Sequence, residues 1–124
     1  MKNKIFLLGL FVLLLVGCAT SSRYVNYTDQ RYPPKDDSFT INVYSNPQAL
    51  GTANPYYVIG KVVIEGFAGS GVNPAGLTVQ AKAIARKRGA DAIINARTEV
   101  FRYYGDTLLR FKGELIVYAP PGKL

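Results

Sequence analysis

A short apolar run near the start of the chain decides which residues are left to fold. Residues Ile5 to Val16 are uninterruptedly apolar, and Lys2 and Lys4 lie just before them. The run is shorter than the ~20 residues that a helix needs to cross a bilayer. A positively charged start followed by such a run is typical of an export signal. We therefore predict that residues 1–17 are a signal peptide and are removed.

The run ends in a motif that contains the one cysteine of the chain. Leu15, Val16, Gly17 and Cys18 resemble the lipobox of bacterial lipoproteins, in which an apolar residue, a small or β-branched residue and Gly or Ala precede Cys. The resemblance implies diacylglycerol on the Cys18 sulfur, cleavage between Gly17 and Cys18, and a fatty acid such as palmitate on the new amino group. Each buried CH₂ contributes ~0.8 kcal/mol, so two or three acyl chains anchor durably. The alternative is an ordinary secretory signal that leaves a free thiol.

The residue after the cysteine bears on the destination of the protein. It is Ala19 and not Asp, which in the sorting rule of enteric bacteria resembles a lipoprotein sent to the outer membrane and facing the periplasm. Without the two signal-peptide lysines, thirteen basic and eight acidic side chains remain, a formal charge of +5 on 107 residues. Such a charge favours polyanions. Nucleic acid is not an expected partner, because an exported protein does not meet it in the cytoplasm.

The composition excludes several classes of chemistry. With no His and one Cys, the chain cannot assemble a Ser-His-Asp or Cys-His centre, a thiolate zinc cluster or an internal disulfide. The carboxylates are scattered, and the glycine-rich stretch Gly69–Gly71 fits neither the Walker nor the dinucleotide-binding pattern. We therefore expect no enzymatic activity, no cofactor and no metal.

Residues 18–37 are predicted to be the lipidated N-terminus and a flexible tether. Their composition is polar, they show neither a helical nor a strand period, and they contain two adjacent prolines. Three tyrosines in this segment, Tyr24, Tyr27 and Tyr32, are unusual for a linker. They could stack on sugar rings or dock on a partner. The alternative is that they are isolated surface residues without a role.

Residues 38–119 predict a single small α+β domain, and residues 120–124 a C-terminal tail. Alternating apolar and polar residues predict a strand over Phe39–Tyr44. A β-branched and aromatic run predicts a long, buried strand over Tyr56–Glu65. The order of elements over the domain is then β-β-α-β-β, a two-layer arrangement with one helix packed on a small sheet.

The helix is predicted between Asn73, a suitable N-cap followed by Pro74, and Gly89, a suitable left-handed C-cap. A narrow apolar stripe repeats along it at helical spacing, formed by Leu77, Ala81, Ile84 and Ala85. The helix ends in the basic run Arg86, Lys87 and Arg88. These three residues either contact an anion or only complement the helix dipole.

The last two strands are predicted as a hairpin of Ala92–Tyr104 and Thr107–Tyr118 around a type II′ turn at Gly105–Asp106. The turn would set apolar pairs on one face: Ile94 with Val117, Ala96 with Leu115 and Val100 with Phe111. It would set polar pairs on the other: Arg97 with Glu114, Glu99 with Lys112 and Phe101 with Arg110. A shift by one residue would mix the two sets.

Two segments resemble a known small-domain pattern. They are Tyr57–Gly60 (YVIG) and Ala81–Ala96 (AKAIARKRGADAIINA), of which Gly89–Ile94 is the most specific piece. A strand with IG, a helix ending in GADAI and a hairpin are similar to YbjQ-like domains and to RcsF-like domains of envelope-stress lipoproteins, over roughly Phe39–Tyr118. The resemblance implies the fold. Since no cysteine follows the lipobox, neither the disulfides of RcsF-like domains nor the heavy-metal site implied by the YbjQ-like name carries over.

The favoured function is a non-enzymatic interaction or stress-sensing module, anchored in the envelope by its lipid. Aromatic residues often anchor interfaces, and four tyrosines are expected to gather near one end of the sheet: Tyr56, Tyr57, Tyr103 and Tyr104. Alternatively, they only close the edge of the core. The partner is another envelope protein, a cell-wall polymer or, as in ring-forming YbjQ-like relatives, a second copy paired through the edge strand Phe39–Tyr44.

The alternative function is binding of an anionic envelope polymer or a lipid head group. The basic run Arg86–Arg88 is the candidate contact for such a ligand.

Overall fold

The computed structural model describes residues 20–51 and 55–119. The predictions for the signal peptide, for the lipobox Leu15–Cys18 and for the tail at 120–124 lie outside the described residues. The elements in chain order are β1 (Thr20–Asn26), β2 (Asn42–Val43), the 3₁₀ turn η1 (Pro47–Leu50), β3 (Tyr56–Phe67), the 3₁₀ turn η2 (Ala68–Ser70), α2 (Pro74–Lys87), β4 (Ala92–Tyr103) and β5 (Asp106–Tyr118).

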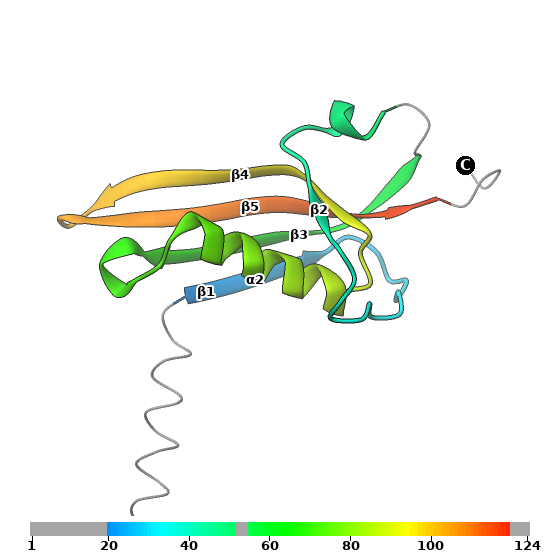
Figure 1. The fold of residues 1–124 in the computed structure, drawn as a ribbon, viewed down its shortest axis with the longest axis horizontal. Coiled ribbons are helices and arrows are strands. Elements are labelled where there is room, and N and C mark those ends of the chain that lie inside the picture. Colours follow the sequence, from blue (N-terminus) through cyan, green and yellow to red (C-terminus); the bar gives the residue numbers. More distant parts are fainter. Residues whose placement is uncertain (1–19, 52–54, 120–124) are drawn as a thin grey trace, which may run out of the picture.

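The strands form one mixed sheet in the order β1-β3-β5-β4-β2, and α2 lies across one face of it (Figure 1). Among the described strands, only the two-residue strand β2 is parallel to its neighbour, β4, and the other pairs are antiparallel. The predicted α+β fold with one helix on a small sheet is therefore confirmed. The sheet has one strand more than the four expected.

The additional strand comes from the predicted tether. Thr20–Asn26 forms β1 at the edge of the sheet, with Thr20 opposite Gly66 and Asn26 opposite Gly60. The expectation of a structureless segment was wrong here because an edge strand needs no alternating pattern when most of its side chains face water. Tyr24 is the β1 residue that packs against the core. The pairing with the well-buried strand β3 supplies the backbone hydrogen bonds.

The predicted strand Phe39–Tyr44 shrinks to Asn42–Val43, paired with Ala92–Ile93 of β4. Its apolar residues are nevertheless inside: Ile41 is buried, and Phe39 packs against the core. The alternating sequence pattern therefore predicted correctly which side chains are buried, but it overestimated how many residues pair as a strand.

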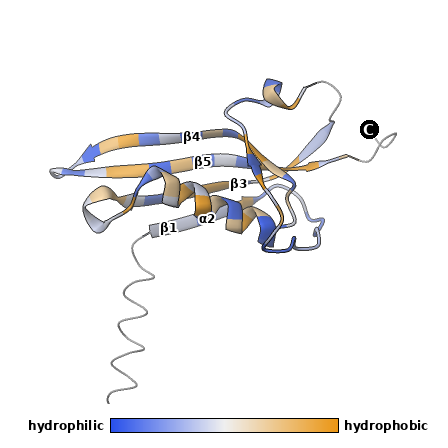
Figure 2. Cartoon of the chain, viewed as in Figure 1, coloured by the Kyte–Doolittle hydropathy of each residue, from blue (hydrophilic) through white to orange (hydrophobic). Residues whose placement is uncertain are grey.

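The main core lies between α2 and the sheet, where Figure 2 shows apolar residues along much of β3 and β5. Alanines on α2 let the helix approach the strands closely, because they project little beyond the backbone. The buried residues of this cluster are Ile41, Ile59, Val62, Ile64, Leu77, Ala81, Ala85, Ala90, Ile93, Leu109, Phe111 and Leu115. On the opposite face, Leu50 of η1 covers a smaller cluster of Ala92, Ile94 and Ile116.

Both predicted ends of the helix are confirmed. The Asn73 side chain accepts a hydrogen bond of 2.8 Å from the Gly76 N–H, and Pro74 occupies the first turn. At the other end Gly89 has φ +77°, and its N–H donates to the Arg86 carbonyl at 3.1 Å. The next N–H, of Ala90, donates to the Ala85 carbonyl at 2.9 Å. These two bonds form a Schellman motif.

The hairpin turn lies one residue earlier than predicted. Tyr104 and Gly105 are its central residues, with φ of +50° and +80°, and Tyr103 pairs with Asp106. Positive φ at both central positions is the geometry of a type I′ turn and not of the predicted type II′ turn. Asp106 belongs to β5 instead, where its carboxylate accepts hydrogen bonds from the N–H groups of Gly69 and Thr107 at 3.1 and 2.7 Å.

A bulge after Ile94 overturns the predicted apolar pairs. The register shifts by one residue between Ile94 and Arg97, and Asn95 takes φ +53°. Ile94 then faces the η1 side, whereas Val117 packs in the main core. The other two apolar pairs are also wrong: the partner of Leu115 is Ile93, and those of Phe111 and Val100 are Thr98 and Leu109.

The residues of the predicted polar pairs lie on one face, as expected. Two of the pairs make diagonal contacts between neighbouring strand positions and do not lie directly opposite each other. Lys112 Nζ lies 2.9 Å from Glu99 Oε1, and the Arg110 guanidinium lies 4.8 Å from the Phe101 ring centre. The predicted Arg97–Glu114 pair is wrong, because the Glu114 carboxylate accepts from the Asn95 amide at 2.9 Å. A two-residue change in the turn register preserves the faces of a hairpin and moves each partner along its strand.

Gly89 and Gly71 allow a direct test of how tightly the N-terminal segment packs. Both have positive φ, +77° and +89°, but a Cβ on Gly89 would lie 2.6 Å from the Pro33 carbonyl oxygen, whereas one on Gly71 meets nothing within 4 Å. Gly71→Ala should therefore lose only the ~1–2 kcal/mol of left-handed strain. Gly89→Ala should lose ~2–4 kcal/mol because strain and overpacking add. Urea unfolding measures both, and equal losses would contradict the packing.

Candidate functional site

The segment after β1, residues 27–39, passes around the C-terminal end of α2, and we call this segment the wrap. The Lys35 N–H donates to the Arg86 carbonyl at 2.8 Å, and the Arg86 Nε donates to the Phe39 carbonyl at 2.7 Å. Lys35 Nζ also forms a 3.0 Å ion pair with one oxygen of Asp91, whose other oxygen accepts from the Tyr118 N–H at 2.9 Å. The predicted tether is therefore docked on the domain over this length as well.

Two glycines of the YVIG and GADAI segments make room for the wrap. A Cβ on Gly60 would overlap the phenol of Tyr24, which donates to the Ile59 carbonyl at 3.3 Å. A Cβ on Gly89 would meet the backbone of Tyr32 and Pro33. Both glycines thus admit side chains and backbone of the N-terminal segment. Neither glycine carries a functional group, and each only leaves room for the neighbouring segment.

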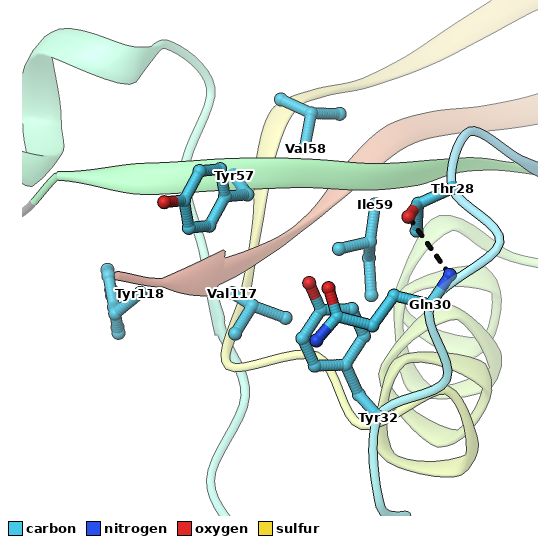
Figure 3. A pocket seen from close by; sticks show the side chains of 8 residues that line it. All are labelled: Thr28, Gln30, Tyr32, Tyr57, Val58, Ile59, Val117 and Tyr118. Carbon is cyan, nitrogen blue, oxygen red and sulfur yellow. Dashed lines mark hydrogen bonds between the residues drawn. The ribbon is translucent and has the colours of Figure 1, made fainter. Parts of the chain in front are cut away.

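The wrap creates a hollow against the strand ends, which we call the tyrosine hollow. Its volume is about 550 Å³, and its lining comes from the loop after β1, the start of β3 and the end of β5 (Figure 3). Three aromatic rings contribute to this lining, together with one amide, one hydroxyl and three aliphatic side chains. The residues are Tyr32, Tyr57, Tyr118, Gln30, Thr28, Val58, Ile59 and Val117.

A second hollow of about 780 Å³ lies on the helix side of the same loop, and we call it the basic hollow. It shares Gln30, Tyr32 and Ile59 with the tyrosine hollow. The remaining lining is polar, cationic or proline: Tyr24, Asn26, Arg31, Pro33, Pro34, Lys87 and Arg88. The C-terminal end of α2, hydrophilic in Figure 2, forms one of its walls.

The basic hollow carries an unbalanced positive charge. No carboxylate is among its lining residues, and none of the salt bridges within the described parts of the chain involves Arg31, Lys87 or Arg88. The Arg88 guanidinium lies 4.2 Å from the centre of the Tyr24 ring, which positions the cation without neutralising it.

Three cations on the open face of the sheet, Arg97, Arg110 and Lys112, are by contrast paired with acids. Glu99 Oε1 lies 2.9 Å from Lys112 Nζ and 3.8 Å from Arg97 Nε, and Glu65 Oε2 lies 2.8 Å from Arg110 Nε. The hydrogen bond from Lys112 is the main reason that the pKa of Glu99 is lowered. The cations of the basic hollow are therefore better candidates for an anion than these three paired cations.

Two tyrosines at the site, Tyr24 and Tyr118, remain neutral phenols at physiological pH because their pKa values are raised. Burial raises the pKa of Tyr24 above its usual value of 10.0, and the charge of Arg88 lowers it in part. Burial also raises the pKa of Tyr118, with smaller contributions from Tyr44 and Asp91 in the same direction. Neutral phenols can donate hydrogen bonds and do not repel an anion.

The three residues of the predicted basic run, Arg86, Lys87 and Arg88, do not share one role in the structure. The Arg86 side chain is occupied by the Phe39 carbonyl, so this residue positions the wrap. Lys87 and Arg88 both line the basic hollow. Arg31 joins them from the predicted tether, where the sequence singled out tyrosines but no cation.

The expectation that four tyrosines gather at one end of the sheet is wrong. Tyr56 and Tyr57 begin β3 opposite Tyr118 and Val117, whereas Tyr103 and Tyr104 lie at the β4–β5 turn. The turn lies beyond the other end of β3, about 40 Å away at ~3.3 Å per strand residue. Of the four, Tyr57 lines the tyrosine hollow, and Tyr56 packs near Leu50 on the opposite face.

The site residues that the sequence did not reveal are Gln30, Arg31 and Tyr118. The three tyrosines of the supposed linker were the available signal, because a segment that only spans distance gains nothing from aromatic rings. Two of them, Tyr24 and Tyr32, pack against the core.

Residues 20–51 and 55–119 contain no group of three or more His, Cys, Asp or Glu side chains that could hold a metal ion. Among the same residues no helix has the length and apolarity needed to span a bilayer. The Gly69 N–H, in the glycine-rich stretch, donates to the chain's own Asp106 carboxylate.

No protein-family model and no curated protein matches the chain. Among solved structures it is similar to the Francisella virulence factor FvfA, seen in a crystal structure of its orthorhombic form. The two chains are 21% identical, and the TM-score is 0.47. The alignment covers 76% of this chain and 96% of FvfA.

The ion pair of Asp91 provides a test of the docked segment. Asp91→Asn removes the charge that holds Lys35 and keeps an oxygen for the Tyr118 N–H. A partly buried ion pair of ~1 kcal/mol corresponds to about a fivefold larger population of the undocked segment. We expect tryptic cleavage after Arg31 and Lys35 to accelerate by about that factor, since cleavage tracks the open population. The isosteric control Glu114→Gln, on the open face, should leave this rate unchanged; an unchanged rate in Asp91→Asn would contradict the docking.

Proposed function

We propose that the protein is a non-enzymatic lipoprotein of the bacterial outer membrane, with its folded domain in the periplasm, and that the domain binds an anionic saccharide polymer of the envelope. The observation that carries the proposal is the basic hollow, which has three cations and no carboxylate and adjoins a hollow lined by three tyrosines. Cations at an open site attract phosphate or carboxylate groups. Tyrosine rings offer flat apolar faces to sugar rings and hydroxyls for hydrogen bonds.

The amides beside these rings fit the same ligand class. Asn26 and Gln30 lie among the cations and the rings, and an amide can both donate to and accept from sugar hydroxyls. A protein partner, the other expectation, would favour a mostly apolar centre with a polar rim. The lining of the basic hollow is mixed instead: Ile59, two prolines and two tyrosine rings lie beside two amides and three cations.

The position of the site relative to the proposed anchor is consistent with this role. Cys18 lies two residues before Thr20, which pairs with Gly66 near the end of β3. The tyrosine hollow lies at the beginning of β3, about 30 Å away at ~3.3 Å per residue. A domain held at Cys18 would thus carry its binding site at the far end of the sheet.

The anchor itself is tested by Cys18→Ser in the full chain with its signal. We expect the variant to lose the mass of the acyl groups and to leave the membrane fraction, because no acyl chain remains to hold it. Gly17→Ala is the matched control, since Ala is accepted at this lipobox position, and it should remain lipidated. Intact-mass spectrometry and fractionation give both readings. Unchanged mass and retention in Cys18→Ser would refute the anchor.

The saccharide site is tested by neutralising two cations of the basic hollow, with Arg31→Gln and Lys87→Gln combined in the lipidated full chain. Each exposed charge contributes ~0.5–1 kcal/mol, so sedimentation with purified cell-wall sacculi should weaken by about five- to thirtyfold. The control pair Arg23→Gln and Lys82→Gln removes the same charge outside the hollow and should have little effect.

Binding of the unmodified protein should also fall as salt rises, because the attraction is Coulombic. Equal binding of both double variants, or binding that is independent of salt, would argue against the saccharide site and in favour of a protein partner.

A further inference from the structure

The β4–β5 turn presents aromatic rings that the fold does not use. Tyr104 is 93% exposed and Tyr103 is 54% exposed. The two rings form an edge-to-face contact with centres 4.6 Å apart, and the Tyr103 ring centre lies 6.2 Å from that of Phe67. The three rings form one cluster, which we call the aromatic tip. Exposed aromatic clusters of this kind mark contact surfaces.

The backbone conformation at Tyr104 is unfavourable for a tyrosine. Its φ is +50°, at a type I′ turn position where Asn, Asp or Gly is preferred. A tyrosine there incurs left-handed strain, and its ring buries almost nothing within the protein. Folding alone therefore does not explain this side chain.

The aromatic tip lies at the end of the sheet where the chain enters from Cys18. Figure 1 shows the start of β1 and the β4–β5 turn at the same end. Thr20 is level with Gly66 and with Leu109 of β5. From that level the turn extends about four residues further, or ~13 Å, whereas the two residues back to Cys18 reach at most ~7 Å.

These dimensions match a bilayer interface. The head-group layer is ~5–7 Å thick on each side of the hydrocarbon. With the acyl chains of Cys18 in the hydrocarbon, the aromatic tip reaches the head groups or the upper acyl region. It is displaced sideways from β1 by only two to three strand spacings, or ~10–14 Å. Tyrosine and tryptophan favour that layer because their rings are amphipathic.

We propose that Tyr103, Tyr104 and Phe67 form a membrane-contact surface that inserts into the head-group region of the bilayer that holds Cys18. The lipid anchor and the aromatic tip are then two points of attachment, which fix the long axis of the sheet upright on the membrane. The two hollows are held away from the surface. This inference rests on the anchor of the proposed function and is independent of the saccharide ligand.

The chain has no tryptophan, so a single introduced indole reports its own surroundings. Tyr104→Trp in the lipidated full chain is reconstituted into phosphatidylethanolamine–phosphatidylglycerol vesicles, with and without brominated acyl chains. Tyr27→Trp is the control: Tyr27 follows β1 at the far end of the sheet and is 53% exposed. We expect the indole emission of Tyr104→Trp to shift to the blue and to be quenched by bromine several-fold more than that of Tyr27→Trp.

Flotation with the vesicles and the intact mass distinguish a failure of the membrane-contact surface from a failure of the lipid anchor. If the chain floats with its acyl groups and bromine quenches Tyr104→Trp no more than Tyr27→Trp, the membrane-contact surface is refuted and the anchor stands. If the chain carries no acyl group and does not float, both are refuted.

Discussion

The pairing of β1 with β3 is the interaction on which the rest of the arrangement depends. It turns residues directly after the proposed lipidation site into the edge of the sheet, from Thr20 opposite Gly66 to Asn26 opposite Gly60. With this strand in place, the chain from Cys18 enters the domain at one end of the sheet, and the loop after Asn26 emerges at the other. The separation between the anchor and the two hollows follows from the length of one strand.

The wrap that follows β1 converts a plain helix end into a binding surface. Hydrogen bonds between Lys35, Arg86 and Phe39 hold the segment, and the ion pair with Asp91 links it to the start of β4. Without this segment the C-terminal end of α2 would carry two cations near an open strand end. With it, Arg31 and the ring of Tyr32 complete the walls of both hollows.

The sequence was sufficient for elements whose signals are local. Asn73, Pro74 and Gly89 define the helix because caps act on adjacent backbone groups, and the apolar run at Tyr56 defines β3 because a buried strand needs such residues. Between the bulge and the turn the hairpin faces were also predictable, because an error of two residues in the turn keeps each side chain there on its own face. The bulge after Ile94 was not predictable, since Asn95 and Ala96 carry no pattern that distinguishes an unpaired residue.

The candidate site was less predictable because it is made by the segment with the weakest local signals. A polar edge strand shows no period when its partner supplies the apolar surface, so β1 resembled a linker. The basic run of α2 was identified as a candidate contact, but Arg31, Gln30 and Tyr32 come beside it only through the wrap. Gly60 and Gly89 stood out as parts of a motif, and their use is visible only when a Cβ is placed against Tyr24 and Pro33.

Hydrogen exchange of the backbone amides of Thr20–Asn26 in the full chain tests this arrangement most directly. In an edge strand every second amide faces the neighbour, so alternate amides of β1 should exchange orders of magnitude more slowly than in an unstructured chain. The Tyr27 amide, which donates to the Ile59 carbonyl at 2.9 Å, should be protected with them. Exchange of all these amides at unstructured rates, with β3 and β5 still protected, would show that the segment is a free tether and would contradict the placement of anchor and site at opposite ends.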